Sequence, residues 1–245
     1  MARTSSSSGL VSQFDAIKAD WLSATTRRKS TSSPPQPFIT IARQAGAGGR
    51  TLAHHLAERL NESERADPPW QAYDRELVEK VAADHKLSTR IVDTLEDTSH
   101  NWLRYYPESL VYPHDPSEMK VFHWVAATIR ALALAGRAII VGRGGVFITE
   151  GMPCGRHIYL VAPLEHRVEH MAGEWGLSRD DTNKEILEMD KNRRRFYQRH
   201  FPKHQVTPEA FTLTLNTAQL SDQEMVDMLL PRILSRVEAP SSMHP

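Results

Sequence analysis

Short apolar runs and longer amphipathic stretches alternate along most of the chain. The apolar runs, which predict strands, lie at 39–41, 70–73, 138–141, 157–161 and 211–215. The stretches between and after them, which predict helices, lie at 51–60, 74–82, 119–135, 164–172, 178–190 and 221–237. This alternation is typical of an α/β fold in which helices connect the parallel strands of one sheet.

The first predicted strand leads into a turn with three glycines in four positions, 46, 48 and 49. Leu52, Leu56 and Leu60 then follow at helical spacing. A strand, a glycine-rich turn and a helix in this order direct several backbone N–H groups and a helix N-terminus at one point, which is a geometry that holds a phosphate. A glycine-rich turn without a ligand is the alternative that the turn alone leaves open.

The turn differs from the nucleotide-binding motif G-x-x-x-x-G-K-[ST] at two positions. Gly48 matches the second glycine of the motif, but Arg43 stands at the first. Gly49 stands where the lysine is expected, and Arg50 and Thr51 follow it. We expect Arg50 to replace the lysine, because a guanidinium group can bind two phosphate oxygens at once.

Two more polar positions follow predicted strands. Asp74 comes directly after the second strand, where it either caps the next helix or offers a carboxylate at the sheet edge that binds ligands in open α/β sheets. Arg143 stands in a second glycine turn, after the third strand. Nine of the 12 glycines lie in 46–49 and 136–155, and this clustering favours a binding crevice. A structural turn with a solvated Arg143 is the alternative.

A basic stretch without acidic residues extends from 191 to 203. Its cations are Lys191, Arg193, Arg194, Arg195, Arg199 and Lys203. Ser178 and the acids at 180 and 181 predict the N-terminus of the helix that carries this stretch. The stretch is either a movable arm of arginines that covers phosphates and excludes water, or a solvated basic face of a helix.

Composition excludes several classes of function. The 245 residues include 30 basic and 30 acidic side chains, so no global field attracts nucleic acid or an anionic membrane. Cys154 is the only cysteine, which excludes an intrachain disulfide and a cysteine-based zinc site and favours a reducing, cytoplasmic location. Because no run of about 18 apolar residues exists, a membrane-spanning helix is not expected.

The chain divides into three parts. Residues 1–36 are rich in Ser, Thr and Pro, and we expect a flexible leader with one amphipathic turn. Residues 37–238 are expected to form the domain, and 239–245 a tail. Within the domain, 87–116 holds an aromatic cluster, which either forms a base-stacking wall or packs under a helical insertion.

Five sequence segments, taken in their order along the chain, form a further pattern. They are ITIARQAGAGGRTLA, AYDRELVEKVA, IIVGRGGVF, MDKNRRRFYQRHF and LNTAQLSDQEMVDMLL. Together, from about Phe38 to Val237, they resemble the cytidylate kinase-like family of P-loop nucleoside monophosphate kinases. The resemblance implies a three-layer α/β/α P-loop fold with a mostly parallel sheet, a helical nucleotide-binding insertion at about 87–116 and a helical lid at about 176–204.

The resemblance also implies a role for individual residues. The turn that would bind ATP consists of Gly46, Ala47, Gly48, Gly49, Arg50 and Thr51, with Thr51 also a metal ligand. The residues implied at the acceptor site are Asp74, Arg75, Arg143 and Arg167. The implied catalytic cations are Arg50, Arg143, Arg193 and Arg194, the last two from the lid.

The activity implied by the resemblance is phosphoryl transfer from ATP, with Mg²⁺, to a nucleoside monophosphate, with CMP or dCMP as the first candidates. A small-molecule nucleotide is the expected partner, with no nucleic acid and no membrane. Because the motif lysine is absent, two alternatives stay open: a nucleotide-binding regulatory protein without turnover, and a kinase for another small phosphorylated acceptor. The attacking phosphate oxygen is already anionic in the implied reaction, so none of the 12 histidines is assigned as a general base.

Overall fold

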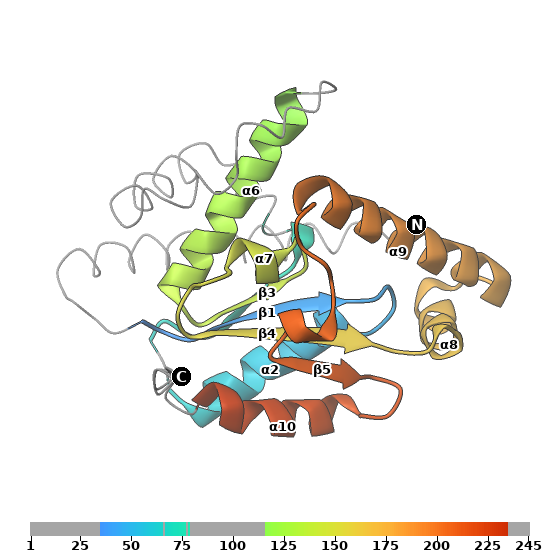
Figure 1. The fold of residues 1–245 in the computed structure, drawn as a ribbon. Helices are drawn as coiled ribbons and strands as arrows, with labels where there is room; N and C mark the ends of the chain where they lie inside the picture. Colours follow the sequence, from blue (N-terminus) through green and yellow to red (C-terminus); the bar gives the residue numbers. More distant parts are fainter. Residues whose placement is uncertain (1–34, 66, 77, 79–115, 235–245) are drawn as a thin grey trace, which may run out of the picture.

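The computed structural model describes residues 35–65, 67–76, 78 and 116–234. Its centre is a sheet of five parallel strands in the order β2-β3-β1-β4-β5 (Figure 1). The strands are β1 (Phe38–Arg43), β2 (Gln71–Tyr73), β3 (Ala138–Val141), β4 (Gly155–Val161) and β5 (Leu213–Asn216). Ile41 of β1 pairs with Val141 of β3 on one side and with Ile158 of β4 on the other, so β1 lies in the middle of the sheet.

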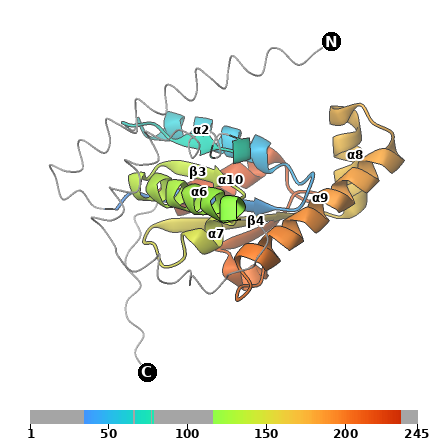
Figure 2. The ribbon, with the colours of Figure 1, turned by 90° about the horizontal axis from the view of Figure 1, so that it is seen from above.

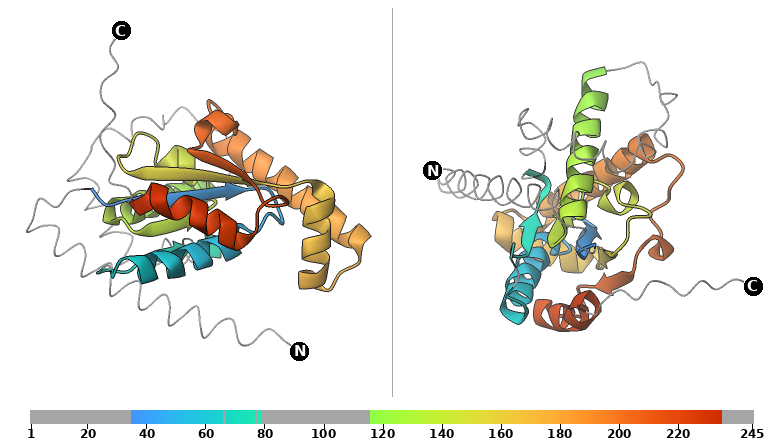
Figure 3. Two further views of the ribbon diagram at one scale, coloured as in Figure 1. Left: turned by 90° about the horizontal axis from the view of Figure 1, so that it is seen from below. Right: turned by 90° about the vertical axis from the view of Figure 1, so that its left-hand side faces the viewer.

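Helices cover both faces of the sheet. Helices α2 (Gly49–Ser63) and α10 (Asp222–Leu234) lie on one face, which Figure 3 shows from below. Helix α6 (Pro116–Ala135) and the short α7 (Gly145–Ile148) lie on the other face (Figures 1 and 2). The predicted three-layer α/β/α arrangement is therefore confirmed.

The alternation of side chains along β1 supplies a separate core to each face. Ile39 and Ile41 pack in the core under α2 and α10, whereas Phe38 and Ala42 pack in the core under α6. Successive side chains of a strand point to opposite faces, so this division follows directly from the sequence of β1.

A helical hairpin lies beyond the carboxyl ends of β1 and β4 (Figure 2). It consists of α8 (Leu164–Trp175) and α9 (Arg179–His200). Ser178 caps α9 as predicted, since its Oγ accepts the N–H of Asp181 at 3.1 Å. A small core joins the hairpin to the turn after β1, and its buried members are Ala45, Val168, Met171 and Ile186.

The structure differs from the predicted elements in two places. The strand predicted at 211–215 begins at Leu213, because a 3₁₀ turn, Pro208–Ala210, precedes it and the ring of Phe211 stacks on Tyr159 with 4.8 Å between centroids. Helix α7 is not predicted, because four residues are too few to show a helical period.

Several predictions fall on residues outside the described part of the chain. These residues are the leader to residue 34, almost all of the insertion, most of the helix predicted at 74–82, and the tail. Among the described helices, none is both long and apolar enough to cross a membrane.

Candidate functional site

The turn between β1 and α2, residues 44–48, and the first residues of α2 carry backbone N–H groups that are available to a ligand. Gly48 adopts a left-handed conformation, with φ 72° and ψ 13°, and precedes α2 without a side-chain cap. Within the described part of the chain, no acceptor binds the N–H groups of Gly46, Gly48, Gly49, Arg50 and Thr51. Amide groups left open by a turn and by the start of a helix are suited to bind an anion.

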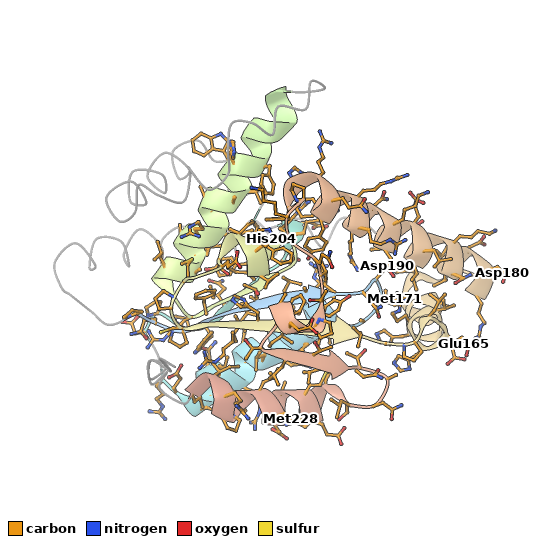
Figure 4. The ribbon with its side chains drawn as sticks, viewed as in Figure 1. Glu165, Met171, Asp180, Asp190, His204 and Met228 are labelled. Atoms are coloured by element: carbon orange, nitrogen blue, oxygen red, sulfur yellow. The ribbon has the colours of Figure 1, made fainter. Side chains whose placement is uncertain are left out.

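Side chains of α8 and α9 hold this turn in place. Asp190 of α9 accepts the N–H of Ala45 through Oδ1 at 2.7 Å and Nη1 of Arg167 through Oδ2 at 2.7 Å. Arg167 of α8 also donates to the carbonyl oxygens of Ala45 and Ala162, at 2.9 and 3.0 Å. Figure 4 shows Asp190 on the side of α9 that faces β1 and α8. Both backbone groups of Ala45 are therefore fixed by the hairpin.

Arg167 was expected at the acceptor site by resemblance. Its side chain is only 7 % exposed, and its guanidinium group is bonded to a carboxylate and two carbonyl oxygens of the protein. This position gives Arg167 a structural role in holding the turn. Its contact with a substrate stays a prediction.

Arg43, the last residue of β1, connects the two glycine turns of the sheet. A Cβ atom at Gly49 would lie 3.2 Å from both Cγ and Cδ of Arg43, and a Cβ atom at Gly142 would collide with its Nη1. The side chain therefore passes the start of α2 and reaches the turn after β3. Burial and, after it, the nearby guanidinium group of Arg193 lower the pKa of Arg43 from 12.5 to about 10.

Two predicted arginines lie beside Arg43. Arg193 of α9 donates from Nη1 to the carbonyl oxygen of Arg43 at 3.2 Å, and the same Nη1 lies 3.6 Å from Oδ1 of Asp190. Arg143 stands in the turn after β3 with φ 56°, and its Cζ lies 5.8 Å from the centre of the Phe196 ring of α9. Burial is the main reason that the pKa of Arg143 falls to about 10. A bound anion would stabilise the charged form of each of these arginines.

Asp74 and Arg50 form an ion pair near the arginine cluster that consists of Arg43, Arg143 and Arg193. Oδ2 of Asp74 lies 2.8 Å from Nη2 of Arg50, and the two side chains are 17 % and 62 % exposed. Arg50, the predicted cation of the turn, is thus directed at a carboxylate near the surface. Thr51, its neighbour, is exposed on the first turn of α2.

The structure brings together only part of the predicted set. The turn at 46–49, Arg143 and Arg193 all adjoin Arg43. Arg194 is exposed, because it follows Arg193 and is rotated by about 100° around α9. Arg75, directly after Asp74, is exposed. Its positive charge adds to the effect of burial in lowering the pKa of Arg143, so the two arginines are close enough to interact.

Sequence reasoning missed Arg43 and Asp190 as site residues. Arg43 is visible in the sequence only as a departure from the first glycine of the motif. Asp190 has a clearer signal, since Ile186, Asp190, Arg193 and Tyr197 recur at helical spacing and so share one face of α9.

Positive charge is left uncompensated at this place. Of the nearby carboxylates among the described residues, Asp190 is shared by Arg167 and Arg193, and Asp74 pairs with Arg50. The guanidinium group of Arg43 makes no ion pair or hydrogen bond with any described residue. A mostly buried cation that has no partner among the described residues, beside open N–H groups, indicates a binding site for an anion.

A sequence model of the cytidylate kinase-like family matches residues 38–219. No curated protein is significantly similar to the sequence. Among solved structures, an uncharacterized protein from Eubacterium ventriosum ATCC 27560 has a TM-score of 0.62 and 18% identity, over 82% of this chain and 99% of that chain. This similarity supports the α/β architecture.

Two further solved structures are less similar. A shikimate kinase from Bacteroides thetaiotaomicron has a TM-score of 0.41 and 15% identity, over 80% of this chain and 95% of that chain. A gluconokinase from Sinorhizobium meliloti 1021 has a TM-score of 0.42 and 13% identity, over 81% of this chain and 91% of that chain.

Proposed function

The chain belongs to the cytidylate kinase-like family, and we propose that it transfers a phosphoryl group from ATP to a nucleoside monophosphate, with CMP or dCMP as the first candidate acceptors. One observation carries the proposal: beside the open N–H groups of the glycine turn, the Arg43 side chain passes Gly49 and reaches Gly142, and Arg143 and Arg193 lie close to Arg43. Phosphoryl transfer needs mainly the positioning of two anions and the neutralisation of their charge, and this set of groups is suited to both tasks.

The two sides of the cluster would take different substrates. The open N–H groups of Gly46, Gly48, Gly49, Arg50 and Thr51 would bind the terminal phosphates of ATP, since they lie at or just before the N-terminus of α2. Arg143 and Arg75 would bind the acceptor phosphate, and Arg193 would stabilise the group in transfer. The attacking oxygen is already anionic, so the protein has no proton to remove from it.

Magnesium would accompany the donor phosphates. Among the described residues there is no group of three or more His, Cys, Asp or Glu side chains that could hold a metal ion. Mg²⁺ does not require such a group, because substrate phosphates and one or two carboxylates commonly bind it. Asp74, which follows β2 and is partly exposed, fits this requirement, and the hydroxyl of Thr51 is a second candidate ligand. The bound ion would neutralise part of the phosphate charge.

A coupled assay of ADP release tests the proposal directly. Purified protein is given ATP, Mg²⁺ and, in turn, CMP, dCMP, UMP, AMP and GMP, and turnover above that with water as the acceptor is expected for at least one of them. A thermal-shift screen narrows the panel first, because a ligand at 100 times its Kd adds about 2.7 kcal/mol to the free energy of unfolding.

Variants separate the site from the rest of the basic helix. Arg143→Met should lower kcat/KM by roughly 10- to 100-fold, since a hydrogen bond to a charged group contributes about 1.5–3 kcal/mol. Arg195→Met removes a cation of α9 that is 61 % exposed and should leave kcat/KM unchanged. Equal effects of the two substitutions would contradict the acceptor site. ATP binding without turnover on any acceptor would favour the regulatory alternative.

A further inference from the structure

We propose that Arg43 takes the place of the missing lysine of the phosphate-binding turn, and that its guanidinium group, rather than that of Arg50, contacts the bound polyphosphate. The proposal rests on the proposed function only for the identity of the anion. It assigns the cation of the turn to the end of β1 instead of the start of α2.

The Arg43 side chain lies against position 49, where the motif has its lysine. Gly49 is the first residue of α2, where the motif has its lysine. A Cβ atom there would lie 3.2 Å from Cγ and Cδ of Arg43, which is closer than ordinary van der Waals contact. A side chain at 49 would therefore push Arg43 away from its present position, whereas glycine at 49 leaves room for Arg43.

The far end of the same side chain explains a second glycine. Gly142 has φ 85°, and a Cβ atom on it would collide with Nη1 of Arg43. The N–H of Gly142 donates to the carbonyl oxygen of Ile41 at 2.9 Å, so this turn is held against β1. Arg43 is thus directed between two backbone turns, each of which has a glycine at the point of closest approach.

The charge of Arg43 calls for an anion at this point. The guanidinium group has no ion pair or hydrogen bond with the residues that the structure describes, and Arg193 adds a second cation nearby. A buried charge without a partner is unfavourable. The start of α2 contributes the partial positive charge of a helix N-terminus. An anion bound to the N–H groups of Gly48 and Gly49 would lie next to the Arg43 side chain. Its negative charge would compensate the charges of Arg43 and Arg193 and the partial charge of the helix N-terminus.

Arg50 is less suited to this role. Its guanidinium group pairs with Asp74 at 2.8 Å, and its side chain is 62 % exposed. Water and salt screen an exposed charge, and the carboxylate competes with phosphate for the same donors. We therefore expect Arg50 to contribute less to polyphosphate binding than Arg43.

Binding of inorganic tripolyphosphate to the full chain, measured by calorimetry, compares the two arginines without requiring turnover. Arg43→Met should raise Kd by roughly 10- to 100-fold, because it removes charge-assisted hydrogen bonds while keeping an unbranched side chain. Arg50→Met should raise Kd by about fivefold or less, as for a screened surface charge. Arg195→Met is the matched control and should leave Kd unchanged. Circular dichroism establishes that each variant is folded.

A rescue variant tests the exchange of positions. Gly49→Lys alone should not strengthen binding, because its side chain meets Arg43, and it should lower Tm. Arg43→Ala combined with Gly49→Lys should bind within about tenfold of the wild type, since a lysine then occupies the space. If Arg43→Met does not fold, this double variant and Arg43→Lys test the role of Arg43 in its place. Arg43→Lys should bind tripolyphosphate about tenfold more weakly than the wild type.

The outcomes separate this inference from the proposed function. Tripolyphosphate binding that is absent in the wild type, unchanged in folded Arg43→Met, or more sensitive to Arg50→Met overturns the role of Arg43. Binding that depends on Arg43, without turnover on any monophosphate, refutes the proposed kinase activity and supports the role of Arg43. Turnover with an unchanged KM for ATP in Arg43→Met refutes the role of Arg43 and leaves the kinase activity standing.

Discussion

Breaking the contact between Arg167 and Asp190 tests whether α8 and α9 hold the glycine turn. Nη1 of Arg167 and Oδ2 of Asp190 are 2.7 Å apart, and the side chains are 7 % and 15 % exposed. The other oxygen of Asp190 accepts the N–H of Ala45 at 2.7 Å. The substitutions Arg167→Met and Asp190→Ala, made singly and together, separate the ion pair from its surroundings.

The expected losses in the free energy of unfolding follow from these contacts. Removing one partner of a buried ion pair costs about 3–5 kcal/mol, because the other charge stays buried. Asp190→Ala also leaves the Ala45 N–H without its acceptor, so its loss should be about 5 kcal/mol. Arg167→Met leaves Asp190 bonded to Ala45 and 3.6 Å from Arg193, so its loss should be about 3 kcal/mol. The double variant removes both charges and should lose about 4–5 kcal/mol, which gives a coupling of about 3–4 kcal/mol.

Urea denaturation of the four proteins measures this coupling, provided that their m-values agree. The control is a second pair between the same helices, Arg179 and Glu169, which lie 3.0 Å apart but are 64 % and 62 % exposed. The coupling of this pair should be below about 1 kcal/mol. A coupling of Arg167 with Asp190 as small as that of the exposed pair would refute the structural role of the contact.

Three further predictions concern single residues. Gly142→Ala and Gly151→Ala should each lower the free energy of unfolding by about 1–2 kcal/mol, because both positions have a left-handed conformation. Chemical denaturation should show a larger loss for Gly142→Ala, because the new Cβ meets Arg43 at 142 and open space at 151. Ser178→Ala should cost about 1 kcal/mol in thermal denaturation, because it removes the N-cap of α9, and an unchanged Tm would contradict this. Burial lowers the pKa of His200 from 6.5 to about 4, so the unfolded chain binds the extra proton between these values. Stability should therefore fall as pH falls through this range, and should fall less in His200→Phe.

The order of strands and helices is readable from the sequence because each element has its own apolar period. Leu52, Leu56 and Leu60 recur at helical spacing and are fully buried in α2. Ser178 marks the start of α9 through chemistry that acts within one turn of helix. Such local signals do not require knowledge of the partner across the fold, and they are confirmed.

The cation of the turn is harder to identify, because a motif assigns roles by sequence position and the contact is made in space. Position 50 is next to the expected lysine, yet Arg50 is directed at Asp74, which follows a different strand. Arg43 precedes the turn, and only the path of its side chain past Gly49 brings it to the site. The sequence shows that both arginines are present, but it does not show where either side chain points.

The residues of α9 illustrate a second limit. A basic run such as 191–203 does not by itself tell which arginine faces the site, because neighbours on a helix diverge by about 100°. The face is fixed by Ile186 and Asp190, which contact the hairpin core and the turn. Arg193 shares this face and reaches Arg43, whereas Arg194 is exposed.

The same contacts bear on the predicted lid at 176–204. The middle of α9 is joined to the turn by the bond from Ala45 to Asp190 and by the bond from Arg193 to the carbonyl oxygen of Arg43. A helix bonded at these points does not swing away as a rigid body unless the bonds that position the turn are broken as well. We therefore expect Arg193 to be in place before the nucleotide binds, and groups that are preorganised stabilise developing charge without rearranging during the reaction. We therefore expect closure over the substrates to come from the tip of the hairpin, where α8 ends and α9 begins, because the tip has no such bonds to the turn among the described residues.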